Sequence, residues 1–121
     1  MSVESYQDLD VWQRAMALAE QAYVLTKGFP REEQFGMASQ IRRAASSIPA
    51  NIAEGWARGR TTEFLQFLRV AMGSLRELET HLLLSQRVGL ASEAEIQPLL
   101  DSIGVLSRQL LALQRSLRRS S

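Results

Sequence analysis

Residues 93–118 read EAEIQPLLDSIGVLSRQLLALQRSLR. Apolar residues recur there every seven positions, with others of the same kind between them: Ile96, Ile103, Leu110 and Leu117, then Leu99, Leu106 and Leu113. Such a repeat marks a helix with one apolar seam, as in bundles with left-handed packing. Ser92, followed three residues later by Glu95, predicts a capping box at its start. The stretch therefore predicts a long helix that packs against other helices.

Three earlier stretches show the helical period of three and four residues. Their apolar stripes are Leu9, Trp12, Met16, Ala19 and Tyr23; Met37, Ile41, Ala45, Ile48 and Ile52; and Phe64, Leu68, Ala71, Leu75, Leu78 and Leu82. Together the four stretches predict helices over about residues 10–27, 30–54, 62–88 and 93–118. The expected fold class is all-α, an antiparallel up-down-up-down four-helix bundle, with residues 1–121 forming a single domain.

Glycine and proline punctuate these helices. Gly28 is expected to end the first in a left-handed conformation, and Pro30 suits the first position of the second. Thr61 is the expected N-cap of the third helix. Pro49 lies inside the second stripe, where its missing N–H bends or breaks a helix. The stripe keeps its phase on both sides of Pro49, which favours one kinked helix over two separate helices.

Composition narrows the class of protein. The chain has 121 residues, with 14 Lys and Arg against 13 Asp and Glu, so its net charge is +1 and does not by itself indicate nucleic acid. The absence of cysteine excludes disulfides and thiolate-bound metals, and a single histidine excludes a multi-histidine metal site within one chain. The N-terminus lacks the features of a secretory signal, and Arg or Glu interrupts each apolar run. We therefore expect a cytoplasmic protein without a membrane partner.

Two helices carry more apolar residues than one buried face requires. The additional positions are Val11, Leu18 and Leu25 in the first helix and Leu65, Met72 and Leu83 in the third. One interpretation is a thick core. The other, which we favour, is that these six residues form the interface of a homo-oligomer.

Thirteen of the 14 basic residues are arginine, and several have no acidic residue three or four positions away. On helical wheels two stripes emerge: Arg69, Arg76 and Arg87 on the third helix, and Arg108, Arg115 and Arg119 on the fourth. Residues 1–33 carry three basic and six acidic residues, whereas residues 34–90 carry seven and four. Guanidinium groups bind phosphate oxygens bidentately, so the stripes are candidates for nucleic-acid binding; the alternative is a solvated charged face.

The segment 39–60 is rich in small and polar residues around Pro49. Small residues permit close helix approach, and Ser46, Ser47 or Asn51 could satisfy carbonyl groups freed by the proline. The competing interpretation is a binding surface that includes four further arginines: Arg42, Arg43, Arg58 and Arg60.

Catalytic motifs are missing from the sequence. It has no P-loop, dinucleotide fingerprint or nucleophile elbow. His81 is expected at the surface or an interface, and the acids that precede it do not have the Glu-x-x-His spacing of di-iron bundles. We therefore expect no enzyme activity, no catalytic or metal-ligating residues and no cofactor.

Four segments carry a family resemblance: SQIRRA at 39–44, SIPANIAEG at 47–55, Glu63-Phe64, and GSLRELET at 73–80. From about Leu9 to Gly89 the chain resembles the 23S rRNA intervening-sequence family, whose members are small bacterial four-helix bundles of largely unassigned role. That family is similar in fold to the accessory variability determinant of diversity-generating retroelements. The resemblance implies a homo-oligomer, expected as a pentamer, that binds RNA or DNA, and it implies a reverse transcriptase as an example of a protein partner.

The sequence and the family resemblance together predict one function and one alternative to it. The first is a non-catalytic homo-oligomeric bundle that binds nucleic acid through arginine-lined faces. The alternative is a protein-interaction scaffold that docks a partner protein and has no role with nucleic acid.

Overall fold

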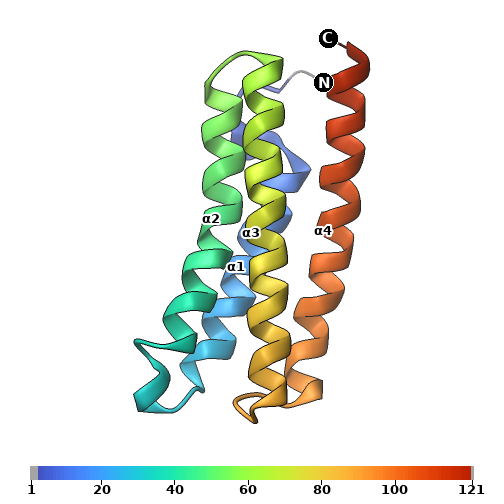
Figure 1. Ribbon diagram of the computed structural model, residues 1–121. Helices are drawn as coiled ribbons and strands as arrows, with labels where there is room; N and C mark the ends of the chain where they lie inside the picture. The colour runs from blue at the N-terminus through green and yellow to red at the C-terminus, as the bar shows by residue number, and fades with distance from the viewer. Residues whose placement is uncertain (1–2, 121) are drawn as a thin grey trace.

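Four long helices lie side by side in the computed structural model, which describes residues 3–120 (Figure 1). In chain order the elements are η1 (Tyr6–Asp8), α1 (Asp10–Lys27), η2 (Arg31–Glu33), α2 (Met37–Ala57), α3 (Thr61–Arg87) and α4 (Glu93–Ser120). The described residues contain no strand, which confirms the all-α fold class. The α1–α2 and α3–α4 connections lie at one end of the bundle, and the α2–α3 connection lies at the other, near both termini (Figure 1).

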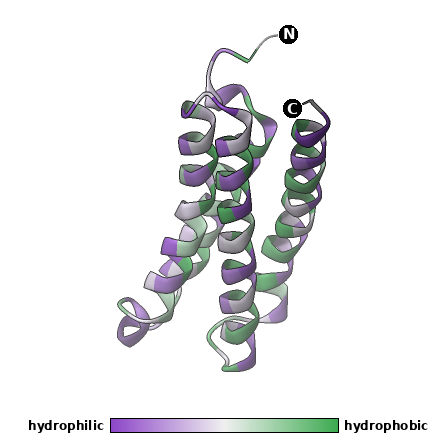
Figure 2. Cartoon of the chain, turned by 45° about the horizontal axis from the view of Figure 1, so that its top comes forward, coloured by the Kyte–Doolittle hydropathy of each residue, from purple (hydrophilic) through white to green (hydrophobic). Residues whose placement is uncertain are grey.

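The seam of α4 packs into the core as its repeat predicts. Ile96, Ile103, Leu106 and Leu110 are each at most 1% exposed. Hydrophobic and hydrophilic residues are interspersed along the helices at the front of the view (Figure 2). The capping box also forms: Ser92 N–H donates to Glu95 Oε1 at 2.9 Å, and Glu95 N–H donates to Ser92 Oγ at 3.1 Å.

The first helix buries only part of the stripe that we expected to face the core, since Ala19 is buried and Leu9 and Trp12 pack against the core. Val11 and Leu18 are buried in the core, whereas Met16 and Tyr23 of the predicted core stripe are exposed. Both stripes have helical spacing, and a single sequence does not reveal which one faces the neighbouring helices. Only the packing of α1 between α2 and α4 makes that choice.

The start of α2 differs from the prediction. Pro30 has an extended ψ of 153°, and η2 follows it in place of the first turns of α2. The long helix begins at Met37, whose N–H donates to Glu33 Oε1 at 3.1 Å. Gly28 has a φ of −83°, so it is right-handed and not left-handed as expected.

Two further details of the helix ends are settled. The N-cap of α3 is Arg60, and Thr61 is already helical, so the expected Thr61 cap was one residue late. Gly89, which ends the turn after α3, has a φ of 82°, a conformation that glycine adopts without strain.

Helix α2 continues through Pro49 as one helix. Asn51 Nδ2 donates to the Ser47 carbonyl at 2.8 Å, and Ser46 Oγ donates to the Arg43 carbonyl at 3.3 Å. The carbonyl that loses its donor to Pro49 is that of Ala45, four residues earlier. The side chains of Asn51 and Ser46 therefore hydrogen-bond carbonyl groups other than that of Ala45, which is not the arrangement that we expected. The bend of α2 at Pro49 stays a prediction.

Candidate nucleic-acid interface

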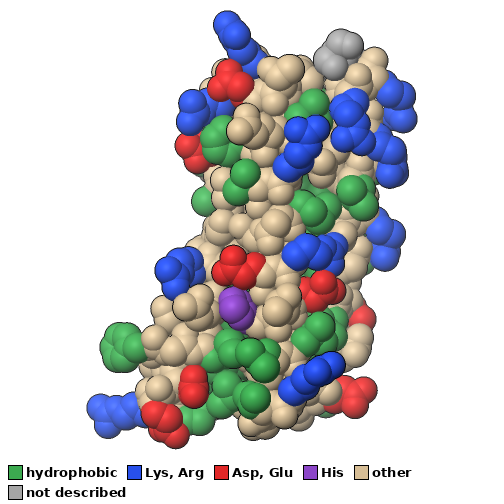
Figure 3. Space-filling view, in the orientation of Figure 1, with side chains coloured by type: hydrophobic (Ala, Val, Ile, Leu, Met, Phe, Trp, Pro, Cys, Tyr) green, Lys and Arg blue, Asp and Glu red, His purple; other side chains and the backbone are tan. Residues whose placement is uncertain are grey.

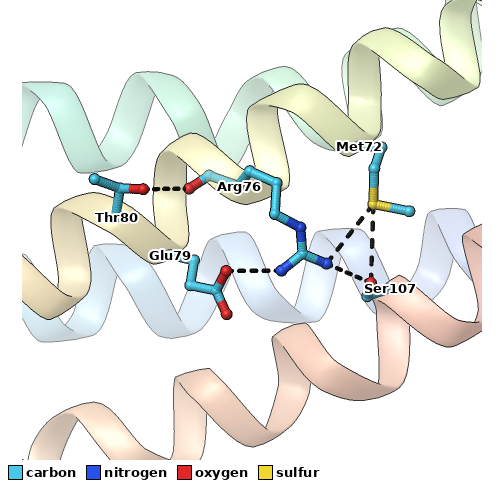
Figure 4. A network of polar contacts seen from close by, with 5 residues as sticks. All are labelled: Met72, Arg76, Glu79, Thr80 and Ser107. Carbon is cyan, nitrogen blue, oxygen red and sulfur yellow. Dashed lines mark hydrogen bonds and ion pairs between the residues drawn. The ribbon is translucent and has the colours of Figure 1, made fainter.

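Arg76 joins α3 to α4 near the middle of both helices (Figure 4). Its guanidinium donates hydrogen bonds to Ser107 Oγ on α4 and, at 2.7 Å, to Glu79 Oε1 on its own helix. The sulfur of Met72 lies 3.8 Å from both the Arg76 guanidinium and the Ser107 hydroxyl. This network fixes which residues of α3 and α4 stand at the same height.

The register places Arg69 of α3 on the same half of the molecule as Arg115 and Arg119 of α4. The two helices run in opposite directions (Figure 1). A residue seven positions before Arg76 on α3 therefore stands at the same height as the residue seven positions after Ser107 on α4. Arg69 therefore stands at the height of Gln114, the residue that precedes Arg115. A rise of 1.5 Å per residue places Arg115 about 10 Å beyond Arg108, and Arg119 about 6 Å further.

Four arginines define what we call the arginine face: Arg69, Arg108, Arg115 and Arg119. All four are exposed, and within residues 3–119 none of them has a hydrogen-bond or ion-pair partner. The sequence has no Asp or Glu between Phe64 and Arg76 and none after Asp101. Figure 3 shows Lys and Arg side chains gathered over the upper part of α4, whereas the Asp and Glu side chains near the top of the view lie on the other side, toward α2. The face therefore carries uncompensated positive charge.

Glycines lie close to these arginines on both helices. Gly73 lies between Arg69 and Arg76 and is exposed, and a Cβ built there would meet nothing within 4 Å. A Cβ at Gly104 would meet only the Arg108 guanidinium, at 3.6 Å. Because Gly73 carries no side chain, a large ligand can approach the backbone of α3 next to Arg69.

Other candidate arginines are held by contacts with neighbouring side chains of the bundle. Arg42 Nε donates to the buried Thr26 hydroxyl at 2.8 Å, and its guanidinium lies 5.1 Å from the centre of the Tyr23 ring.

Arg58 is held in the same way. It pairs with Glu54 at 3.2 Å and with Glu63 at 3.9 Å, and it lies 5.1 Å from the centre of the Phe67 ring. Arg42, Arg58 and Arg76 therefore stabilise helix contacts and offer less free charge than their sequence positions indicate.

The remaining candidates are exposed but separate. Arg43 lies on α2, and Arg60 lies in the α2–α3 connection, at the same end of the bundle as the end of α4 (Figure 1). Arg87 is at the opposite end of α3, about 27 Å from Arg69. The structure thus splits the predicted stripe on α3, because its length places Arg87 outside the arginine face.

Three of the six predicted interface residues are unavailable at the surface. Val11, Leu18 and Leu65 are 5%, 1% and 6% exposed and belong to the bundle's own core, so the interface prediction was wrong for them. Leu25 and Met72 are half-buried against that core. Only Leu83, at 43%, is openly exposed.

A different apolar surface takes their place. Met16, Tyr23 and Val24 of α1 are exposed and line a groove of about 670 Å³ between α1 and α2. Phe35, in the connection before α2, is 99% exposed. The sequence carried a signal for Phe35, since it stands outside every apolar stripe, but it was missed.

Catalytic or metal-binding geometry does not emerge from the described part of the chain. His81 is half-buried, with Nε2 3.5 Å from Glu77 Oε2. No group of three or more His, Cys, Asp or Glu side chains there could hold a metal ion. No described helix is long and apolar enough to cross a bilayer.

Known proteins resemble this chain in sequence and in fold. A family model described as 23S rRNA-intervening sequence protein matches residues 7–112. A crystal structure of a protein of unknown function from the S23 ribosomal protein family of Bacteroides thetaiotaomicron superposes with a TM-score of 0.77 at 21% identity, covering 86% of this chain and 97% of that one. No curated protein matches the chain.

Proposed function

The chain belongs to the 23S rRNA-intervening sequence protein family, and from that premise we propose that it is a non-catalytic helical bundle that self-associates and binds nucleic acid. The observation that carries the proposal is the arginine face, where four exposed guanidinium groups stand on a surface without a carboxylate partner within residues 3–119. The net charge of +1 understates this local field, because most of the acidic residues lie elsewhere.

The chemistry of the face suits phosphate. A guanidinium group donates two parallel hydrogen bonds to phosphate oxygens and keeps its charge at any physiological pH. Each phosphate that it neutralises releases condensed counterions, so binding weakens steeply as salt rises. The rigid backbone of α4 holds three of the four arginines, which lowers the cost of arranging them.

Self-association is supported by the apolar surface of α1. Val24 is 69% exposed and borders two grooves, of about 670 Å³ toward α2 and about 580 Å³ toward α4. Covering such a surface with a second copy removes apolar area from water. An assembly, such as the pentamer that the family resemblance implies, would also display several arginine faces on one particle and strengthen binding by multivalency.

Salt-titrated binding tests the nucleic-acid role. The triple variant Arg69→Gln, Arg108→Gln, Arg115→Gln should lose most affinity for mixed-sequence RNA and DNA. The matched control is Arg14→Gln, Lys27→Gln, Arg31→Gln, which removes the same charge from α1 and η2. Equal losses in the two triples would show that net charge and not this face matters, and no binding of the wild type at low salt would reject the role.

The second candidate function, a protein-interaction scaffold, is favoured by the same exposed surface of α1. Its signature would be one stoichiometric protein partner that survives nuclease treatment and is lost in Val24→Arg, together with no affinity of the purified chain for nucleic acid. The salt titration therefore separates the two candidates.

A further inference from the structure

We infer that the arginine face binds the sugar–phosphate backbone of a double helix in preference to a single strand, and does so without reading sequence. This inference rests on the proposed nucleic-acid role and narrows it to one class of ligand. Three features of the face carry it: its lack of aromatic side chains, the straight spacing of its charges, and its shape.

Aromatic side chains are absent where a single strand would need them. Proteins that hold single strands stack the bases on aromatic rings along a charged groove. The sequence of α4 contains no Phe, Tyr or Trp. On α3, Phe64 and Phe67 pack toward α2, where both would meet a Cβ at Gly55. The arginine face thus offers unstacked bases no platform.

The most exposed aromatic rings lie elsewhere. Tyr23 is on α1 and Phe35 is in the α1–α2 connection. Because that connection lies at the end of the bundle opposite the last turns of α4 (Figure 1), Phe35 cannot serve a strand bound at Arg115 and Arg119.

The charges form a stiff, straight column. Arg108, Arg115 and Arg119 project from one unbroken helix at separations of about 10 Å and 6 Å along its axis. A duplex presents phosphates at fixed positions, so a rigid column can meet several of them without ordering the ligand first. A flexible single strand would have to be straightened to do the same, which costs conformational entropy.

The shape of the face keeps it out of the grooves. One helix with its side chains fills the major groove of B-DNA, which is about 12 Å wide. Here α4 is flanked by α1 and α3, at the usual separation of about 8–10 Å for packed helices. The bundle therefore rests on phosphates across a groove, and Gly73 leaves room beside Arg69 for that approach.

Four labelled ligands of equal length test the inference: double-stranded RNA, double-stranded DNA, and a mixed-sequence single strand of each. At one low salt concentration we expect at least one duplex to bind on the order of tenfold more tightly than either single strand. Scrambling the duplex sequence should leave its affinity unchanged. Comparing the two duplexes identifies which backbone geometry fits.

Variants link the preference to the face. Each of Arg108→Gln, Arg115→Gln and Arg119→Gln should reduce the slope of log affinity against log salt for the duplex by about 1, while Arg31→Gln leaves it unchanged. All four side chains are exposed, so the fold should survive, as circular dichroism would verify.

Two results distinguish failure of this inference from failure of the function. Single strands that bind as tightly as duplexes, or a strong sequence preference, would overturn the inference while nucleic-acid binding stands. No binding to any of the four ligands at low salt would overturn the proposed function itself.

Discussion

The guanidinium of Arg76 on α3 is hydrogen-bonded to the hydroxyl of Ser107 on α4, although 31 positions of sequence separate the two residues. The same guanidinium pairs with the Glu79 carboxylate at 2.7 Å, so its charge is balanced within the chain although the side chain is half-exposed (Figure 4). The contact sets the register of α3 against α4 and thereby places Arg69 at about the same height as Arg115. Arg76 is thus a positioning residue of the arginine face more than a ligand of phosphate.

Replacing Arg76 should weaken the fold. Arg76→Ala removes the bond to Ser107 and an ion pair that is partly exposed, and we expect a loss of about 1 kcal/mol in the free energy of unfolding. Urea denaturation followed by circular dichroism measures it. The matched control, Arg69→Ala, touches no partner and should stay within about 0.5 kcal/mol of the wild type. Equal effects of the two substitutions would contradict a bridging role for Arg76.

Two glycines on the outer side of the bundle should be replaceable with a gain in stability. Gly73→Ala and Gly104→Ala introduce a Cβ that meets nothing within 4 Å at the first position and only Arg108 at 3.6 Å at the second. Alanine costs less backbone entropy in a helix, so each substitution should stabilise the protein by up to about 1 kcal/mol. The midpoint of thermal unfolding should rise.

Replacing a third helical glycine, Gly55, should have the opposite effect on stability. A Cβ at Gly55 would lie 2.5 Å from Phe67 Cβ and 3.2 Å from Phe64 Cδ1. Gly55→Ala should therefore force α2 and α3 apart and destabilise the fold by about 1–3 kcal/mol. If it were neutral, the close approach of these two helices would be in doubt.

The capping box of α4 should make stability sensitive to acid. The backbone N–H of Ser92, and after it the Ser92 side chain, hydrogen-bonds the Glu95 carboxylate and lowers its pKa from the ordinary value of 4.5. Because the folded state holds this proton less tightly than the unfolded chain, the contribution is complete above pH 4.5 and disappears as the pH falls through the lowered pKa.

The variant Glu95→Gln checks this sign. Glutamine keeps the capping hydrogen bond but does not titrate. Comparing urea midpoints at neutral pH and at about pH 3 should therefore reveal a smaller acid loss in the variant than in the wild type. An equal loss would mean that Glu95 does not contribute to the acid sensitivity.

Self-association should depend on the exposed side of α1. Val24 is 69% exposed, and Val24→Arg places a charge on this apolar surface. The sedimenting mass should therefore fall toward that of the 13.6 kDa chain. Val70→Arg, at a valine that is 47% exposed on α3, is the matched control and should leave the mass unchanged. A wild type that sediments as a single 13.6 kDa chain would refute self-association.

Local patterns in the sequence determined the helices and most of the core. The seven-residue repeat from Ile96 to Leu110, the Ser92–Glu95 cap and the passage of α2 through Pro49 depend on neighbours within a few turns of the chain. Such interactions can be read from one sequence because helical geometry fixes which residues meet.

Tertiary structure alone decided which apolar stripe of α1 is buried and which arginines are free. Leu18 and Met16 both fit a helical stripe, and only the packing of α2 and α4 around α1 covers the first and exposes the second. The sequence already pairs Arg76 with Glu79 at helical spacing and leaves Arg108 without a local acid, but the second partner of Arg76, Ser107, lies on another helix and cannot be read from the sequence. Contacts between residues distant in sequence depend on how the helices are placed in space, and helical periodicity carries no information about that placement.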